Sequence, residues 1–235
     1  MFTLRSTSIG AIFFGIFTFQ AVLTAAPVRF LPWDDDIASR KIGFDNGKQV
    51  AELKDLHPNK RSKTLDGGSG EIPAQLIALD RTSPDGKPVT AAIKIMPGIL
   101  SPLVLILPDP RQASGLRAFV IEDNSANFGW GTARFINATG KVLLVRQDKT
   151  TKTLPESWVP IDFDPGGMAR NTSVQLVLRD NLKAILYSAI WEHDPNVRKL
   201  ALVLPGTDAR TGAVEIKIIP EDRRTIPPIA TSKAE

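Results

Sequence analysis

Hydrophobic and polar residues alternate along much of the chain after Pro27. Residues 174–178 and 214–218 each place an apolar side chain at every second position. Successive side chains of a strand point to opposite faces, so a period of two gives a strand with one apolar face. No segment shows a long helical stripe. The pattern therefore predicts strands throughout.

Two other segments, residues 103–107 and 200–204, are apolar at every position. Such runs are typical of strands that are buried on both faces. Turn-forming residues separate the runs at short intervals, as in Asp85-Gly86 and Asp109-Pro110. Many short strands divided by turns predict an all-β fold, and we expect β-sandwiches of the immunoglobulin-like kind.

The chain also repeats itself at an offset of about 97 residues. The first copy has Leu103, Leu105, Leu107, Pro108, Gly115, Phe119 and Ile121, and the second has Leu200, Leu202, Leu204, Pro205, Gly212, Ile216 and Ile218. Three pairs of triplets keep the same order: 29–31 with 134–136, 63–65 with 152–154, and 75–77 with 175–177. We therefore expect an internal duplication that gives two sandwich domains, residues 27–123 and 128–222. Chance similarity between apolar strands is the alternative.

The N-terminus has the order of a secretory signal peptide. Arg5 precedes an uncharged apolar stretch over residues 9–23, and small residues then lead to Pro27. An apolar helix partitions into the bilayer, and small residues fit the signal peptidase. We expect residues 1–26 to direct export and to be cleaved near Ala25 or Ala26. An uncleaved membrane anchor is the alternative, because the stretch is just long enough to span a bilayer.

Composition narrows the range of functions. The chain of 235 residues has no cysteine and two histidines, which excludes disulfides, Cys-ligated zinc, iron–sulfur clusters and a Cys nucleophile. Loss of the signal segment lowers the net charge from +4 to +3, and this charge is too small to indicate binding to nucleic acid.

An exported chain without cysteine indicates a bacterial periplasm or exterior, and we expect no membrane span after cleavage. The tail, residues 223–235, has no apolar period and is expected to be disordered.

Two stretches resemble proteins of a known kind. Residues 128–140 read Phe-Gly-Trp-Gly-Thr-Ala-Arg-Phe-Ile-Asn-Ala-Thr-Gly, and residues 186–191 read Leu-Tyr-Ser-Ala-Ile-Trp. They resemble exported, uncharacterised bacterial proteins of the Verrucomicrobia and Planctomycetes type, although Gly129 stands where a proline is common. The resemblance covers under half of the chain. It implies a β-sandwich and no established activity, so no catalytic residue is carried over.

One segment has residues suited to a metal ion. Glu192, His193 and Asp194 are adjacent and precede Pro195. A metal needs at least three converging ligands, whereas a strand would turn His193 away from its neighbours. A turn at Pro195 would have to bring them together. A solvated loop is the alternative interpretation.

Other catalytic patterns are weaker. The chain has no Gly-x-Ser-x-Gly motif for a Ser–His–Asp triad. Clustered carboxylates at residues 34–36, and the pair Asp162 and Asp164, could bind calcium, but neither has the EF-hand pattern. We therefore expect neither a catalytic residue nor a cofactor.

Tryptophans are the remaining candidates for ligand binding. Trp130 lies in a Gly-Trp-Gly turn, and Trp158 lies in another polar segment, so either could stack on a sugar. Tryptophan is equally common in a core. We interpret the chain as an exported, non-enzymatic envelope protein with a protein-binding or structural role, with an envelope protein or a glycan as its partner. A carbohydrate-binding module is the alternative, and a metal-dependent hydrolase is a third hypothesis.

Overall fold

The computed structural model describes residues 26–68, 72–206 and 212–226. The predicted signal peptide, apart from Ala26, lies outside the described residues. No helix in the described part is both long and apolar enough to cross a membrane. We refer to residues 27–123 as the N-terminal half and to residues 128–222 as the C-terminal half.

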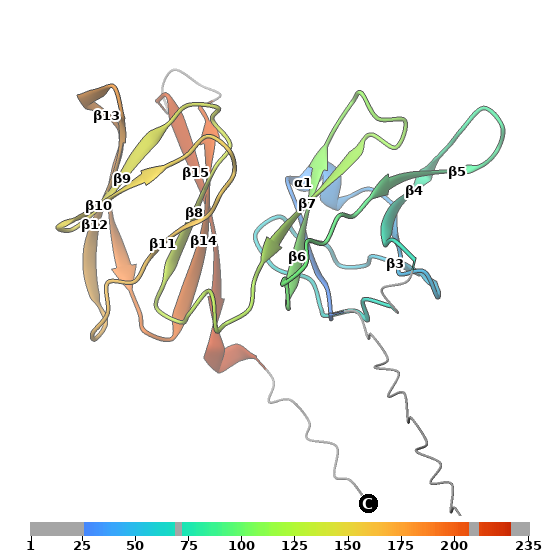
Figure 1. Cartoon of the computed structure of the whole chain (residues 1–235), viewed down its shortest axis with the longest axis horizontal. Helices are drawn as coiled ribbons and strands as arrows, with labels where there is room; N and C mark the ends of the chain where they lie inside the picture. The colour runs from blue at the N-terminus through green and yellow to red at the C-terminus, as the bar shows by residue number, and fades with distance from the viewer. Residues whose placement is uncertain (1–25, 69–71, 207–211, 227–235) are drawn as a thin grey trace, which may run out of the picture.

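The chain is almost entirely β (Figure 1). The N-terminal half contains β1 (Arg29–Pro32), α1 (Asp35–Ala38), β2 (Ile42–Asp45), β3 (Val50–Glu52), β4 (Gln75–Thr82), β5 (Pro88–Ala92), β6 (Pro102–Pro108) and β7 (Leu116–Glu122). The C-terminal half contains β8 (Ala133–Asn137), β9 (Leu143–Gln147), β10 (Thr150–Leu154), β11 (Ile161–Phe163), β12 (Arg170–Leu178), β13 (Asn181–His193), β14 (Val197–Pro205) and β15 (Val214–Asp222). A short 3₁₀ helix, η1 (Arg223–Thr225), follows. The predicted all-β fold is confirmed.

The four sheets form two sandwiches. One sandwich pairs the sheet β1-β6-β7 with β3-β2-β4-β5, and the other pairs β11-β8-β14-β15 with β10-β9-β12-β13. Each encloses its own apolar core, with Phe30 fully buried in the first and Phe135 fully buried in the second. In the N-terminal half β1 pairs in parallel with β6, which forms a hairpin with β7. In the C-terminal half β8 pairs in parallel with β14, which forms a hairpin with β15.

A third apolar cluster joins the two sandwiches. It contains Leu103 and Leu105 of β6 and Leu200 and Leu202 of β14, whereas Val104 and Ala201 on the opposite faces belong to the separate cores. This explains why both strands are apolar at every position. The sheets β1-β6-β7 and β11-β8-β14-β15 are therefore the inner layers of a four-layer stack, which is visible from left to right in Figure 1.

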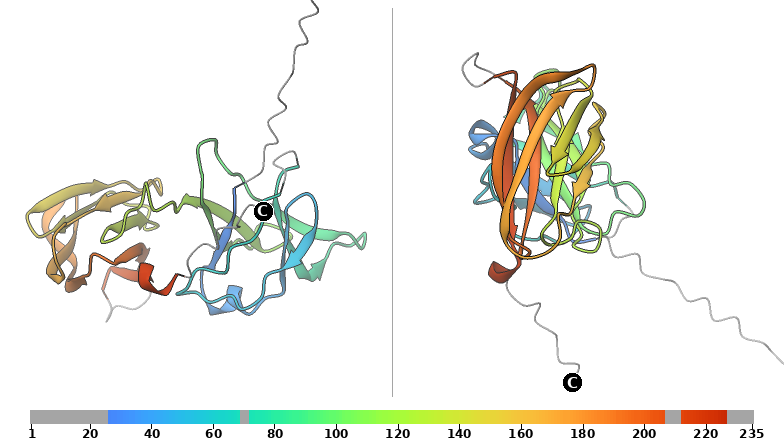
Figure 2. Two further views of the ribbon diagram at one scale, coloured as in Figure 1. Left: turned by 90° about the horizontal axis from the view of Figure 1, so that it is seen from below. Right: turned by 90° about the vertical axis from the view of Figure 1, so that its left-hand side faces the viewer.

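The paired strands place the predicted repeat in register. Arg29 lies opposite Leu103 in the first half, and Arg134 lies opposite Leu200 in the second. The outer sheets also have the same order, with β3-β2-β4-β5 matching β10-β9-β12-β13. Figure 2 shows the two sandwiches from two further directions. This correspondence is what a duplication predicts.

Two of the predicted matches were wrong in register. Leu103 pairs with Ile121, but Leu200 pairs with Ile219, so the equivalent of Ile121 is one residue beyond the predicted Ile218. The triplet at residues 63–65 also matches a different segment from the predicted 152–154. Leu65 bridges Val28 beside β1, and the equivalent bridge beside β8 is made by β11.

The chain stays ordered beyond Asp222, where we expected a disordered tail to begin. Asp222 caps η1 by accepting a hydrogen bond from Arg224 N at 2.9 Å. The Arg223 side chain donates to Asn196 Oδ1 at 2.7 Å, so η1 is held against the β13–β14 turn. Residues 227–235 lie outside the described residues.

Candidate functional site

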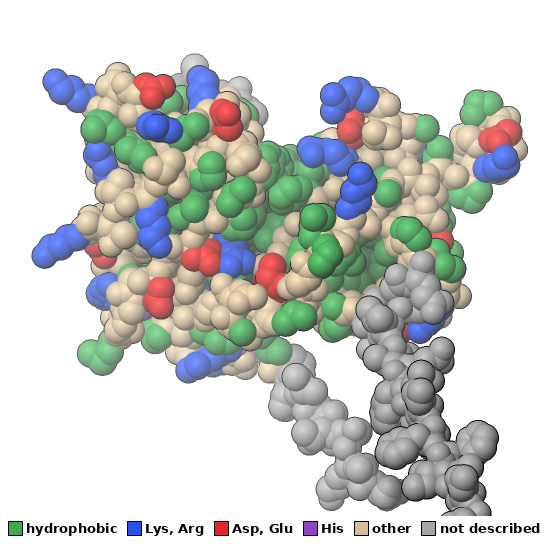
Figure 3. All heavy atoms as spheres, viewed as in Figure 1, with side chains coloured by type: hydrophobic (Ala, Val, Ile, Leu, Met, Phe, Trp, Pro, Cys, Tyr) green, Lys and Arg blue, Asp and Glu red, His purple; other side chains and the backbone are tan. Residues whose placement is uncertain are grey.

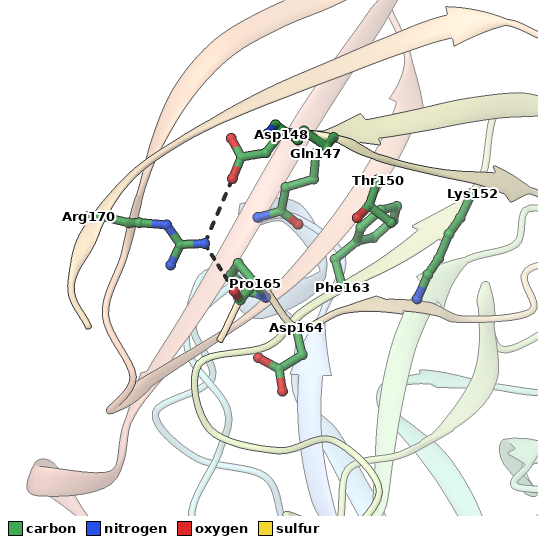
Figure 4. A pocket seen from close by; sticks show the side chains of 9 residues that line it. Gln147, Asp148, Thr150, Lys152, Phe163, Asp164, Pro165 and Arg170 are labelled. Carbon is green, nitrogen blue, oxygen red and sulfur yellow. Dashed lines mark hydrogen bonds and ion pairs between the residues drawn. The ribbon is translucent and has the colours of Figure 1, made fainter. Parts of the chain in front are cut away.

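A hollow of about 670 Å³ opens at one end of the C-terminal half (Figure 4). The β9–β10 turn and the segment between β11 and β12 form its walls. Its lining residues are Gln147, Asp148, Lys149, Thr150, Lys152, Phe163, Asp164, Pro165 and Arg170. The lining has neither a histidine nor a serine, so it does not contain a Ser–His pair.

Most charged groups of this hollow stabilise its own loops. Arg170 donates to the carbonyl of Pro165 at 3.0 Å and lies 3.9 Å from the Asp148 carboxylate. Asp148 in turn accepts a hydrogen bond from Ser173 N at 2.8 Å. Lys152 lies over the ring of Phe163, with Nζ 4.9 Å from its centroid. Few of these groups remain free to select a ligand.

The three predicted metal ligands do not converge. Glu192 is exposed, whereas His193, the next residue of β13, is 4% exposed and faces the interior. Asp194 accepts hydrogen bonds from Asn196 N at 2.8 Å and from Arg224 at 3.0 Å. The Asn196 bond and the Arg224 charge hold the pKa of Asp194 below its ordinary value. Among the described residues, no group of three or more histidines and carboxylates is placed to hold a metal ion.

His193 lies beside a small internal cavity instead. The cavity is lined also by Gln147 and Thr172. His193 Nε2 and Gln147 Oε1 are buried, and neither has a hydrogen-bond partner among the described residues. This histidine therefore belongs to the interior of the sandwich.

The candidate calcium ligands have other roles. Asp34 caps α1 by accepting a hydrogen bond from Ile37 N at 2.8 Å, and the next two aspartates form the first turn. Carboxylates in a first helical turn interact favourably with the helix dipole. Asp162 forms a bidentate pair with Arg134 at 2.6 and 2.7 Å, and Asp164 accepts from Gly166 N.

The two predicted tryptophans lie in different places. Trp158 packs against Phe119 and Trp33, with centroids 4.9 and 6.0 Å away, at the margin of the cluster that joins the halves. Figure 3 shows hydrophobic side chains gathered along this margin. Trp158 has a positive φ of 63°, which is rare for a bulky residue. Trp130 is half-buried, and the guanidinium of Arg198 lies 4.9 Å from its ring.

Five buried or partly buried charged residues lie where the halves meet, and we call them the junction cluster: Arg29, Arg61, Asp123, Arg198 and Glu221. Arg61 donates to both carboxylate oxygens of Asp123, at 2.9 and 3.1 Å. Arg198 donates to Glu221 at 2.7 Å, and Arg29 bonds to both acids. Residues from both halves are therefore held in one network.

The electrostatics of the junction cluster favour ionised acids. Burial opposes ionisation of Asp123 and Glu221, but the surrounding arginines outweigh it and hold both pKa values below their ordinary range. Burial also lowers the pKa of Arg198, against the opposing effect of the two carboxylates. The cluster therefore has three cations and two anions.

Sequence reasoning missed the junction cluster, because its residues are far apart in the chain. The strand pairing does reveal a common feature: Asp123 follows Ile121 by two residues, and Glu221 follows Ile219, which occupies the corresponding position opposite β14, by two.

Strand β13 forms an open edge of its sheet. It is 13 residues long, and among the described strands it pairs with β12 alone. Leu182, Ile185 and Ile190 on it are 53%, 53% and 66% exposed. Residues 187–193 pair without irregularity, whereas the bulges lie nearer the start of the strand. A regular edge with exposed apolar side chains is a template for another strand.

No family model matches the chain, and no curated protein matches it.

Proposed function

We propose that this protein is an exported, non-enzymatic envelope protein that binds another protein through the edge of β13. The observation that carries the proposal is the length and exposure of this edge strand. Backbone N–H and C=O groups alternate in direction along a strand, so every second residue of the regular stretch points them away from β12. A partner strand could pair with these groups.

The side chains of β13 support the same role. Ile190 is the most exposed apolar residue of the strand, at 66%. The strand contains no proline or glycine, and Lys183 is its one basic residue. Proteins commonly protect free edges with proline, lysine or short strands. An edge with so little protection fits a surface that is covered by a partner.

The non-enzymatic part of the proposal is supported by the two histidines. His57 Nδ1 accepts a hydrogen bond from Asn59 N at 3.0 Å within a turn. His193 is buried beside Gln147. Neither histidine forms a hydrogen bond to a serine or a carboxylate among the described residues, as a Ser–His–Asp triad would require. Export is supported by the sequence of residues 1–26.

Sugar binding is the second candidate, and one observation favours it. Trp130 lines a hollow of about 220 Å³ that also contains Arg29 and Arg198. An aromatic ring beside hydrogen-bond donors suits a sugar ring, although the hollow is small for more than one residue of a glycan.

Affinity capture from the native host tests the proposal. The tagged protein, Ile190→Lys and the control Met168→Lys would be compared; Met168 is 85% exposed and lies off this strand. We expect a specific protein to be captured by the wild type and the control, and at least tenfold less by Ile190→Lys. Equal capture by all three, or capture of a glycan that is lost in Trp130→Ala, would contradict it.

A further inference from the structure

The junction cluster borders a hollow of about 710 Å³ between the two halves. Residues 54–64, which connect β3 to β4, form one wall, and residues 220–226 form the other. The hollow therefore contacts both sandwiches. Arg29, Arg61 and Glu221 belong both to its lining and to the junction cluster.

The buried cluster has one positive charge more than its acids can neutralise. Arg61 and Arg198 have side chains that are 4% and 3% exposed, and Arg29 is 21% exposed. Asp123 and Glu221 are the two acids that face them, at 2% and 12%. A charge that is removed from water without a partner is costly, so buried charges are normally paired.

Arg61 has a hydrogen-bonding group without a partner. Its Nε and Nη2 donate to Asp123, on one edge of the planar guanidinium. Nη1 is buried and has no hydrogen-bond partner among the described residues. The guanidinium is planar and its five N–H groups have fixed directions. Because Nε and Nη2 face Asp123, the N–H groups of Nη1 point away from that carboxylate.

The rim of the hollow adds further positive charge. Lys54, Lys60 and Lys63 are exposed and line it. In the described part of the chain, none of the three forms an ion pair. The lining has three acids: Glu221 is shared by the arginines, Asp222 is paired with Arg224, and Asp55 is exposed beside Lys54. The three lysines and two arginines of the lining still outnumber these acids.

From this arrangement we propose that the hollow binds a small molecule with an oxyanion group, a phosphate or a carboxylate, between Arg61 and the three lysines. Guanidinium groups bind such oxyanions with strong, directional hydrogen bonds, and lysines add a less directional attraction. The bound anion would neutralise the excess charge of the junction. The site is separate from the β13 edge, so it stands or fails independently of the proposed protein-binding role.

Titration calorimetry with inorganic phosphate, and separately with acetate, tests the site. The triple variant Lys54→Gln/Lys60→Gln/Lys63→Gln removes the rim charge. The control Lys141→Gln/Lys149→Gln/Lys183→Gln removes the same charge from exposed positions elsewhere. We expect the rim variant to weaken binding at least tenfold and the control to change it less than twofold. Preference for phosphate or for acetate would identify the kind of oxyanion.

A second variant tests the buried arginine. Arg61→Lys keeps one positive charge but loses the fork, so it should weaken binding, with the thermal unfolding midpoint measured alongside to confirm folding. The proposal is overturned if the wild type binds neither anion at millimolar concentration. It is also overturned if rim and control variants lose affinity equally, since that would indicate general attraction to a positive surface.

Discussion

The outer sheets of the two halves have the same strand order but very different edges. In the N-terminal half the edge strand β5 has five residues and begins with Pro88. In the C-terminal half the equivalent strand β13 has 13 residues, and Ile190 is exposed on it. Proline and short length protect an edge from pairing with another chain. The difference teaches that the same strand order can end in a short edge that carries proline or in a long edge with exposed apolar side chains.

The arginines at corresponding positions of β1 and β8 also differ, in the acids with which they form ion pairs. Arg134 of β8 pairs with Asp162 inside its own half, and Asp162 is 33% exposed. Arg29 of β1 pairs with Asp123 and also reaches Glu221 of the other half. Arg134 also donates to the backbone carbonyls of Glu122 and Asn127, so both arginines contact the junction between the halves. Of the two, Arg29 is the one whose ion pairs include an acid from each half.

The largest expected effect is that of Asp123→Asn. The substitution would leave two buried arginines and the partly buried Arg29 facing a single acid, and breaking a buried ion pair costs about 3–5 kcal/mol. Asp162→Asn, at the equivalent arginine, should cost about 1 kcal/mol, because Asp162 is partly exposed. Urea unfolding of both variants measures the difference. Similar losses would show that the two arginine sites are equivalent in energy.

Acid should weaken the junction between the halves. The folded-state pKa values of Asp123 and Glu221 lie below their ordinary values of 3.8 and 4.5. The stabilisation is therefore complete above about pH 4.5 and is lost as the pH falls through the lowered values. We expect the free energy of unfolding of Glu221→Gln to fall less steeply than that of the wild type below pH 4.5. Parallel curves would contradict this.

An alkaline effect of smaller size is expected at Lys217. Its ammonium donates to the carbonyl of Trp33 in the other half, and burial lowers its pKa to about 8, against the opposing charges of Asp34 and Asp35. The unfolded chain then binds more protons between pH 8 and 10.5, so stability should rise with pH over that window. Lys217→Met should remove this rise in thermal unfolding midpoints. A wild type that loses stability there relative to the variant would refute it.

Ile190→Lys should have the smallest effect on the isolated protein. The side chain is 66% exposed, so its replacement should change the free energy of unfolding by no more than about 0.5 kcal/mol. Leu176→Ala on the neighbouring strand, which is fully buried, should cost about 2–5 kcal/mol. A large loss for Ile190→Lys would mean that the edge is structural.

Local pattern was sufficient to predict strands at residues 103–107 and 200–204. It could not predict that these two strands bury their second faces against each other, because that contact depends on how the halves pack. Spacing along the sequence matches Ile121 of β7 to Ile218 of β15, but strand pairing matches it to Ile219. The register of a strand is defined by its pairing, which the spacing does not contain. Arg61, from a loop, gave no local signal of its place beside Asp123.

Photo-crosslinking in the native envelope compares the two edges most directly. A photoreactive amino acid would replace Ile190 on β13 in one protein and the exposed Thr90 on β5 in another. The proposed function predicts a discrete protein adduct from position 190 and none from position 90. Adducts of equal yield from both positions, or none from position 190, would contradict the assignment of β13 as the binding edge.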